Sequence, residues 1–501
     1  MLNNNVDKVI NSRYTWLWKS ADFFRGMLTD EDFRDYFFQL LFYKLLSDKY
    51  RKEYDLALQE FGDEKVAKDK ISHWINIPDG CLWDDIQLTR DGVGRRINFA
   101  VNEIARMNPR LYNLINKIDF TNQKYLSEDY LSQVFQLISQ IDLITDEYTP
   151  EIFGQNFELF IKKYMVEAPA GVAEFYTPRE VVQILVSCLQ PEEGLEIYDP
   201  SCGTGGMLIE SCYYVKRKLG DPKMLYLFGQ EINEDISAIA KINLFLHDVN
   251  AEIILGDTLV NPKFLDKNGE IRKFDIVMAN PPWNQKGYSN LMEEDKFGRF
   301  RYGIAPKRSL DWGWIQHMLA SLKPTGRMAI ILDQGALFRR GTEKTIRKRI
   351  VNEDLINAII LLPNKLFFNT SVSGVILILS KEKINEKKNN ILFINASNEF
   401  ISSPQVRRIN VLSNDNLKNI LNAFYNHITI DGFSRIVDIK EIIENDYDLS
   451  ISKYIFQVEI KETIDVNNEY IEYCNFYKEK KKIDKIIEKL LKKYVQVIKD
   501  K

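Results

Sequence analysis

The chain contains few residues that form covalent or metal cross-links, and it has no internal repeats. Its 501 residues include only five cysteines and four histidines. The cysteines do not have the spacing of metal ligands, so neither a disulfide framework nor a zinc site is indicated; they are Cys81, Cys188, Cys202, Cys212 and Cys474. The histidines lie in apolar or amphipathic stretches, where packing is a more common role than catalysis; they are His73, His247, His317 and His427.

The sequence also lacks long apolar runs and an excess of positive charge. No stretch is long and apolar enough to span a membrane, and residues 1–18 are too polar for a signal peptide. Charged residues make up 28% of the chain and the net charge is −4, which is not the basic balance of an autonomous nucleic-acid-binding protein. These absences favour a cytoplasmic protein without membrane association. With 45% hydrophobic residues, the chain is long enough for two or three globular domains.

Hydrophobic periodicity divides the chain into four expected parts. Residues 1–165 repeat apolar residues at intervals of three and four, which is typical of a helical domain. Between 166 and 400, short apolar runs alternate with amphipathic helices, which predicts an α/β domain whose parallel sheet is covered on both faces. Residues 401–455 are mixed in pattern, and 456–501 form a lysine-rich helical tail. In that tail one face of a helix at about 476–496 carries Ile483, Ile486, Ile487, Leu490, Leu491 and Tyr494.

A glycine-rich turn at 203–206 joins a predicted strand to a predicted helix in LEIYDPSCGTGGMLIES, 195–211. Gly203, Gly205 and Gly206 allow the backbone to bend tightly and to approach a ligand at the start of the helix. An acidic residue ends each of three successive strands: Asp199, Glu231 and Asp257.

The three acids have distinct expected roles. The first can interact with a cation of the ligand, the second can accept both ribose hydroxyls, and the third lies in reach of an adenine amino group. Each acid alone could equally be a helix cap. All three together, at the carboxyl ends of neighbouring strands, favour a nucleoside pocket.

The composition of this turn discriminates between nucleotide ligands. A nicotinamide dinucleotide turn has the pattern G-x-G-x-x-G and binds a pyrophosphate, whereas GTGG lacks the third glycine at that spacing. An aspartate directly before the turn would repel phosphates. A Walker P-loop is excluded, because no Gly-Lys-Ser/Thr comes after the turn. A ligand with an adenosine and an amino acid but no phosphate fits better, and S-adenosyl-L-methionine is such a ligand.

The stretch FDIVMANPPWNQ, 274–285, ends a strand with two prolines and a tryptophan. A bare Asn-Pro pair is most often a simple turn. The second proline and Trp283 exceed what a turn requires, because two prolines stiffen the backbone. A stiff loop can hold the amide of Asn280 and a flat ring in fixed positions, as binding of a planar ligand would require.

These segments together resemble a known family. DPSCGTGG followed by NPPW is similar to the DNA amino-methyltransferases that modify adenine N6, and more closely to the modification (M) subunit of type I restriction-modification systems. The other segments occur in the family's order: EFYTPREVV, AKINLFLHDV, LGDTL, RYGIAPKRSLDWGWIQHML, GRMAIIL, LPNKLFFNTSVSGVILIL and GFSRIVDIKEIIENDYDLSISKYI. The resemblance covers about 10 to 455. Serine after Asp199-Pro200 is a small departure with no consequence for the assignment.

The resemblance implies a Rossmann-like, S-adenosylmethionine-dependent methyltransferase domain that methylates an adenine flipped out of double-stranded DNA. Asn280 and the carbonyl of Pro281 would accept hydrogen bonds from the adenine amino group, Trp283 would stack on the base, and Phe368 would be a second aromatic contact, with simple packing as its alternative role. The catalytic set is thus Asn280, Pro281, Pro282, Trp283 and Phe368. The segment before the glycine turn would contact the methionine end of the cofactor, so the cofactor set is Glu174, Phe175, Tyr176, Thr177, Pro178, Arg179, Asp199, Gly203, Thr204, Gly205, Gly206, Glu231 and Asp257.

The chemistry itself narrows the substrate. Direct displacement of a methyl group needs positioning and electrostatics rather than a covalent nucleophile. Cytosine C5 methylation would require a cysteine after a proline in an active-site loop, and Cys202 comes after Ser201. N4-cytosine enzymes usually have Ser-Pro-Pro, so the asparagine favours adenine. The alternatives are an N-methyltransferase of another planar substrate, such as an RNA base or a protein glutamine, and a scaffold with a decayed site.

The sequence leaves no basic, aromatic-rich region that could read bases in a groove. We therefore expect a separate specificity (S) subunit to read the DNA sequence. The resemblance implies two M chains around one S subunit, with a restriction (R) subunit as a further partner of some systems. The helix at 476–496 is the expected docking element, since its apolar face is flanked by lysines. The alternative is a helix folded back on its own core.

Overall fold

The computed structural model describes residues 30–69, 75–87, 92–112, 114–115, 118–122, 127–140, 177–287, 292, 294–367, 370, 372–403, 409–456 and 466–499. The chain divides into two compact units, 1–455 and 456–501, and each is described by itself. Glu174, Phe175, Tyr176 and Phe368, four of the predicted site residues, lie outside the described residues. No helix in the described ranges is both long and apolar enough to cross a membrane.

The N-terminal part of the larger unit is helical, as its periodicity predicts. Its elements are α2 (Asp30–Phe61), α3 (Glu64–Ala67), α4 (Trp83–Gln87), α5 (Val93–Met107), η2 (Pro109–Leu111) and α6 (Glu128–Ser139). Their core is built around the fully buried Trp83, whose ring stacks on Phe135 with centroids 3.9 Å apart and contacts Tyr43 at 5.4 Å. The indole nitrogen donates a hydrogen bond to the hydroxyl of Ser139, so the one polar atom of the ring is satisfied.

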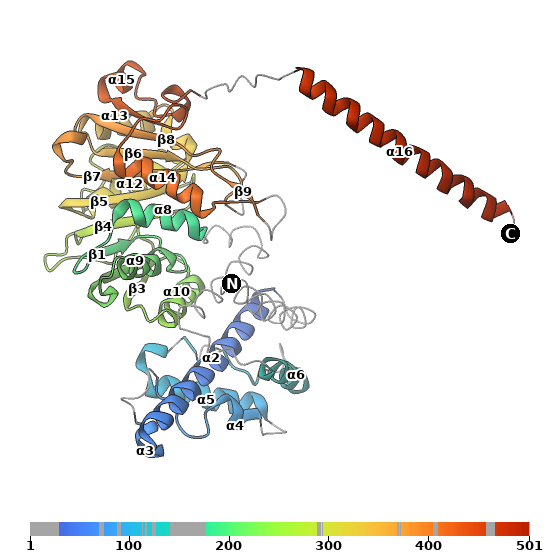
Figure 1. Ribbon diagram of the computed structural model, residues 1–501. Coiled ribbons are helices and arrows are strands. Elements are labelled where there is room, and N and C mark those ends of the chain that lie inside the picture. The colour runs from blue at the N-terminus through green and yellow to red at the C-terminus, as the bar shows by residue number, and fades with distance from the viewer. Residues whose placement is uncertain are drawn as a thin grey trace. The chain divides into compact units, whose positions relative to one another are not determined.

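A nine-stranded sheet forms the centre of the same unit, with the order β11-β8-β6-β7-β5-β4-β1-β2-β3, which can be traced from β8 to β3 in Figure 1. The strands are β1 (Glu196–Asp199), β2 (Tyr226–Glu231), β3 (Ala251–Leu255), β4 (Phe274–Ala279), β5 (Leu322–Asp333), β6 (Ile356–Leu361), β7 (Gly374–Ser380), β8 (Asn390–Asn395) and β11 (Ser434–Asp438). A separate two-stranded sheet pairs β9 (Ile401–Ser402) with β10 (Asn410–Val411).

Both faces of the large sheet are buried, which explains why its strands are continuously apolar. In β5, Met328 and Ile330 pack into one hydrophobic core, and Ala329 and Ile331 pack into the other. Successive side chains of a strand point to opposite faces, so a run without polar residues needs a cover on each face. The first core contains α12 (Asp311–Ala320), α13 (Thr342–Asn352) and α15 (Ile439–Glu444). The second contains α8 (Arg179–Leu189), α9 (Gly206–Arg217) and α14 (Asn414–Asn426).

The sheet is mixed, so the prediction of a parallel sheet is confirmed only in part and is wrong for β7 and β11. Strands β1, β2, β3, β4 and β5 pair in parallel, but β7 lies between β5 and β6 and is antiparallel to both. A parallel connection needs a crossover of a dozen or more residues, usually a helix. Only residues 362–373 connect β6 to β7, and the described residues among them form no helix. Strand β11 is likewise antiparallel to β8.

One further helix packs against both the N-terminal helices and the sheet, and another forms the smaller unit. α10 (Glu234–Leu246) places Ile236, Ile239 and Ile242 in the core of the N-terminal helices, while its Leu244 belongs to a core of the sheet. The smaller unit is α16 (Val466–Lys499), a single helix that includes the predicted 476–496. Its predicted apolar face is exposed within this chain: Ile483, Ile486, Ile487, Leu490 and Leu491 are each 47–61% accessible.

Candidate functional site

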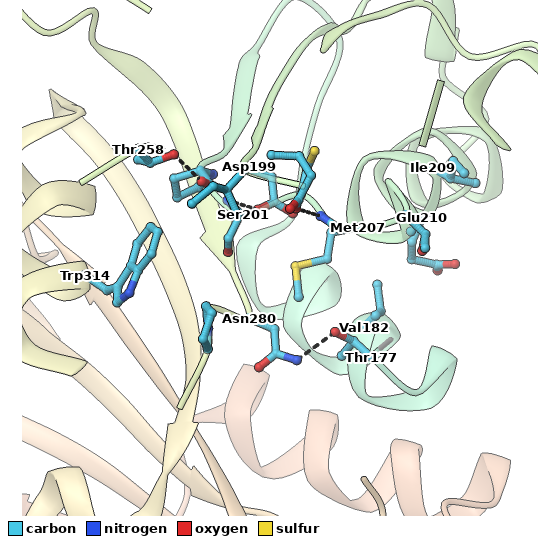
Figure 2. A pocket seen from close by; sticks show the side chains of 18 of the residues that line it. Thr177, Val182, Asp199, Ser201, Met207, Ile209, Glu210, Thr258, Asn280 and Trp314 are labelled. Atoms are coloured by element: carbon cyan, nitrogen blue, oxygen red, sulfur yellow. Dashed lines mark hydrogen bonds between the residues drawn. The ribbon is translucent and has the colours of Figure 1, made fainter. Parts of the chain in front are cut away.

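A pocket lies at the carboxyl ends of β1, β2, β3 and β4, where parallel α/β sheets commonly bind ligands. It brings together residues that are up to 137 positions apart in the sequence, from Thr177 to Trp314 (Figure 2). The predicted site residues that line it are Thr177, Arg179, Asp199, Gly203, Thr204, Gly206, Glu231, Asp257, Asn280 and Pro282. Four others do not line it: Gly205, Pro281, Trp283 and Pro178, of which Pro178 borders a small separate hollow.

The glycine turn has the backbone geometry that its sequence predicts. Gly203 and Gly205 have φ angles of 52° and 80°, in the left-handed region that other residues rarely adopt. A Cβ atom on Gly205 would also lie 3.3 Å from Cγ of Leu244. The backbone amide of Cys202 donates to the carbonyl of Gln230 at 3.0 Å, which fixes the turn against the end of β2. The first residues of α9 therefore line the pocket.

Glu231, at the end of β2, is 3% exposed and uses both carboxylate oxygens. Oε2 accepts the amide hydrogen of Gly203 at 3.0 Å, and Oε1 accepts that of Asn233 at 2.9 Å. Burial raises the pKa of this carboxyl, although the backbone hydrogen bonds act in the opposite direction. The two oxygens together have about four acceptor sites, more than these backbone bonds use, so the side chain can both hold the glycine turn and accept a hydroxyl group.

Asp199, at the end of β1, is 2% exposed and accepts the amide hydrogen of Ser201 at 3.0 Å. Burial, together with the neighbouring Glu231 carboxyl, raises the pKa of Asp199 to about 8. Among the described residues, neither acid forms an ion pair with a lysine, arginine or histidine. Two buried carboxyls without a cation are costly unless protonated. Their arrangement suits a ligand that brings a positive charge and hydroxyl groups, and it disfavours phosphate.

Asp257 combines its predicted place in the pocket with the role of a turn cap. Its Oδ1 accepts the amide hydrogens of Leu259 at 3.0 Å and Val260 at 3.1 Å. The carbonyls of Thr258 and Leu259 in turn accept hydrogen bonds from the buried guanidinium of Arg299 at 3.0 and 2.7 Å. The wall of the pocket after β3 is therefore rigidly supported. The contact of Asp257 with an adenine amino group stays a prediction.

The side chain of Asn280, directly after β4, is held by two hydrogen bonds. Its Oδ1 accepts from the indole nitrogen of Trp283 at 3.0 Å. Its Nδ2 donates to Oγ1 of Thr177 at 2.9 Å, as Figure 2 shows. Because an indole N–H can only donate, the amide oxygen must be the atom that faces Trp283. The oxygen retains a second lone pair. Asn280 is thus oriented before any base arrives, which is the preorganisation that transfer to a planar amine requires.

Trp283 does not line the pocket as a residue that only stacks on a base would, because its ring packs against the protein itself. The ring is partly buried against a core of the sheet and meets Phe367 edge-on, with centroids 4.8 Å apart. Trp314 lines the pocket instead, and its indole nitrogen donates to Oε1 of Gln285 at 2.9 Å. Sequence reasoning missed Trp314, Gln285 and Phe367. The aromatic pattern of DWGW, 311–314, was the available signal for the first of them.

A buried charge network fixes Asn284, the residue after Trp283. The guanidinium of Arg339 bonds Asp311 and Asp333, each at 2.7 Å, and contacts Oδ1 of Asn284. Asn284 also donates its backbone amide to Asp311 at 3.0 Å and its Nδ2 to Asp333 at 2.8 Å. Glu343, fully buried, lies 3.3 Å from the same guanidinium. Asn284 has a φ of 54°, and the network holds it in this strained conformation.

The fold and the pocket define an α/β domain of the Rossmann-like kind, with a ligand-binding site at the carboxyl edge of its sheet. Residues 148–463 match the model of the N-6 DNA methylase family, and residues 15–138 match the HsdM N-terminal domain. The chain belongs to the N-6 DNA methylase family. The predicted family, fold class and enzyme class are thereby confirmed.

Individual relatives agree with this assignment. The type I restriction enzyme MjaVII methylase subunit of Methanocaldococcus jannaschii is 40% identical over 473 residues, which cover 89% of this chain and 79% of that protein. The MjaVIII methylase subunit of the same organism is 36% identical over 502 residues, covering 96% and 84%. The crystal structure of a type I restriction-modification methyltransferase subunit from Streptococcus thermophilus superposes with a TM-score of 0.74 at 27% identity, covering 89% of this chain and 99% of that one.

Proposed function

We propose that this chain is the modification subunit of a type I restriction-modification system and transfers a methyl group from S-adenosyl-L-methionine to N6 of an adenine flipped out of double-stranded DNA. One observation carries the proposal. A pocket with two buried, unpaired carboxyls, Asp199 and Glu231, also contains the preoriented amide of Asn280. A cationic nucleoside and a planar amine can therefore meet in one site.

The cofactor would occupy the part of the pocket between the glycine turn and the ends of β2 and β3. The residues present fit this ligand, because the buried carboxyls favour a cation and offer acceptors to hydroxyl groups. Asp199 would face the amino group of the methionine moiety, and Glu231 would accept the ribose hydroxyls. Thr177 and Arg179, which lie at the start of α8 and line the same pocket, would contact the methionine end.

The target base would enter beside Asn280. The second lone pair of its Oδ1, with the carbonyl of Pro281, would accept the two hydrogens of the adenine amino group. These hydrogen bonds would reduce the delocalisation of the nitrogen lone pair into the ring, so that the nitrogen could attack the methyl group. S-adenosyl-L-homocysteine would leave, and the nitrogen would lose one proton to solvent. Trp283 would hold the amide oxygen of Asn280. The aromatic ring that stacks on the base would be that of Trp283, Trp314 or Phe368, and stacking contributes roughly 1–3 kcal/mol of binding free energy per base. That is comparable to the few kcal/mol that unstacking the base costs.

DNA recognition would come from a separate S subunit, with two copies of this chain around it. The exposed apolar face of α16 would dock on a partner helix of that subunit, since five large aliphatic side chains on one helix face are otherwise open to water. A restriction subunit would join the complex where the system contains one. We place the assembly in the cytoplasm, where its DNA substrate lies.

The test is expression of the chain with its specificity subunit, and then digestion of the methylated DNA to nucleosides. We expect N6-methyladenine, and no product from an Asn280→Ala complex. The matched control is Asn385→Ala, an exposed asparagine of η6 (Asn385–Lys387) at the opposite edge of the sheet. N4-methylcytosine would refute the base assignment. Efficient site-specific methylation by the isolated chain would refute the need for an S subunit.

A further inference from the structure

Four exposed cations surround the loops that carry the base-binding residues. Lys286 comes directly after the Asn280–Gln285 stretch that leaves β4, Lys307 and Arg308 precede α12, and Arg340 precedes α13. These residues are distant in the sequence, but backbone hydrogen bonds join the first two of their loops. Gly287 donates its amide to the carbonyl of Lys307 at 2.9 Å, and Leu310 donates to that of Gln285 at 3.0 Å.

The third loop is tied to the second by side chains. Arg308 Nη2 donates to the carbonyl of Arg340 at 3.4 Å, and Arg339 Nη1 donates to the hydroxyl of Ser309 at 3.0 Å. We define Lys286, Lys307, Arg308 and Arg340 as the cationic rim. Gln285, directly before its first member, lines the pocket. The cationic rim therefore lies beside the place where a substrate enters.

The cationic rim keeps its charge because the local acids are engaged elsewhere. Asp311, Asp333 and Glu343 all lie against Arg339. Asp446 interacts electrostatically with Arg340 but forms its ion pair with Lys344. In the described part of the chain, no carboxylate lies within ion-pair distance of any of the four rim side chains. A chain with a net charge of −4 thus presents a group of four cations without an ion pair, among its described residues, on these connected loops.

We propose that the cationic rim binds the phosphates on either side of the flipped adenine, on the DNA strand that contains it. This inference rests on the proposed function. A base that enters the pocket remains covalently attached through its sugar to two phosphates, so these must lie at the pocket's mouth. Cations there neutralise them and hold the strand while the base is unstacked. Such contacts bind any sequence, which leaves sequence reading to the S subunit.

The experiment compares two variants of the full chain in complex with its specificity subunit. The rim variant combines Lys286→Gln, Lys307→Gln, Arg308→Gln and Arg340→Gln. The control variant combines Lys218→Gln, Lys223→Gln, Lys388→Gln and Lys440→Gln, four exposed cations at the amino-terminal edge of the sheet. Both variants lose the same charge, so a nonspecific effect of net charge would be equal in the two.

The readout is the DNA dissociation constant measured as a function of salt concentration. Each phosphate that is no longer neutralised lowers the slope of log affinity against log salt by about 0.9, so for two phosphates we expect a decrease of about 2 for each copy of the rim variant. The control variant should retain the wild-type slope, and both should bind cofactor as tightly as the wild type. Equal slopes for the two variants would overturn the inference. If the rim variant is unstable, Lys286→Gln with Lys307→Gln should still lower the slope by about 1.

The outcome is separable from that of the proposed function. Failure of the wild-type complex to form N6-methyladenine would refute the proposed reaction, whatever the salt slopes. Normal methylation by the wild type, with unchanged slopes in the rim variant, would refute only the role of the cationic rim. We also expect the rim variant to raise KM for DNA while kcat at saturating DNA stays within about two-fold, since the phosphate contacts act on binding.

Discussion

Replacing Asp199 by asparagine removes one buried titrating group and keeps the shape of the side chain. The amide oxygen can still accept the hydrogen bond from Ser201. The carboxyl of the wild type has a pKa of about 8 in the folded protein against an ordinary value of 3.8, because burial and the neighbouring Glu231 disfavour its charged form. Between these two values the folded chain holds a proton that the unfolded chain has lost. The contribution of this group to stability therefore falls as pH rises, and it stops falling above about pH 8.

The size of the effect is set by the pKa difference. Within the window the free energy of unfolding decreases by about 1.4 kcal/mol per pH unit for one such group. Between pH 6 and pH 8 the wild type should lose about 2 kcal/mol through Asp199, after allowance for its partial ionisation near the upper end.

The assay is urea unfolding of the cofactor-free chain at several pH values from 6 to 8. We expect the Asp199→Asn variant to gain about 2 kcal/mol on the wild type across this range. Asp431→Asn, at an exposed turn, is the matched control and should parallel the wild type. Parallel curves for the wild type and Asp199→Asn would refute the reasoning, since they would show that the carboxyl is already ionised. Calorimetry in buffers of different ionisation enthalpy adds a second readout: a cationic cofactor should release a proton on binding at pH 7 from the wild type and not from Asp199→Asn.

Three further predictions concern the cofactor, the loop and the tail. Glu231→Ala should weaken S-adenosylmethionine binding, measured by calorimetry, by at least about 1–3 kcal/mol, because it removes acceptors of the ribose and leaves the amide of Gly203 unpaired; unchanged affinity would contradict the ribose contact. Arg339→Ala should lower the free energy of unfolding by roughly 3–5 kcal/mol and reduce methyl transfer, since it strands buried carboxylates and frees Asn284, whereas Arg339→Lys should retain part of the stability; an undisturbed variant would show that the network does not hold the loop. Ile487→Ser with Leu490→Ser should abolish co-purification with the specificity subunit, while Lys485→Ser with Lys489→Ser, on other faces of α16, should not; loss in both pairs would show that helix formation rather than the apolar face is what matters.

Much of the fold was predictable because it depends on short-range patterns. Continuous apolar runs predicted the strands from β1 to β7 but not β8 or β11, and in β5 the two cores indeed take alternate residues. The glycine turn was predictable for the same reason, since Gly203 and Gly205 adopt positive φ angles that few other residues tolerate. The antiparallel β7 was not predictable in this way. Strand direction depends on where the chain returns, which the apolar pattern of 374–380 does not encode.

The sequence by itself determined the local chemistry: a glycine turn before a helix, an acid after each of three strands, and an asparagine held by two prolines. Each of these depends on neighbours a few positions away, whose steric preferences act regardless of the rest of the fold. Only the tertiary structure decided what these groups face. It brings Thr177 within hydrogen-bond distance of Asn280, 103 residues later in the chain. It also lets the guanidinium of Arg339 donate a hydrogen bond to Asn284. Such partners are fixed by the order of strands in the sheet and by burial, because a side chain's pKa and hydrogen bonds depend on everything packed around it.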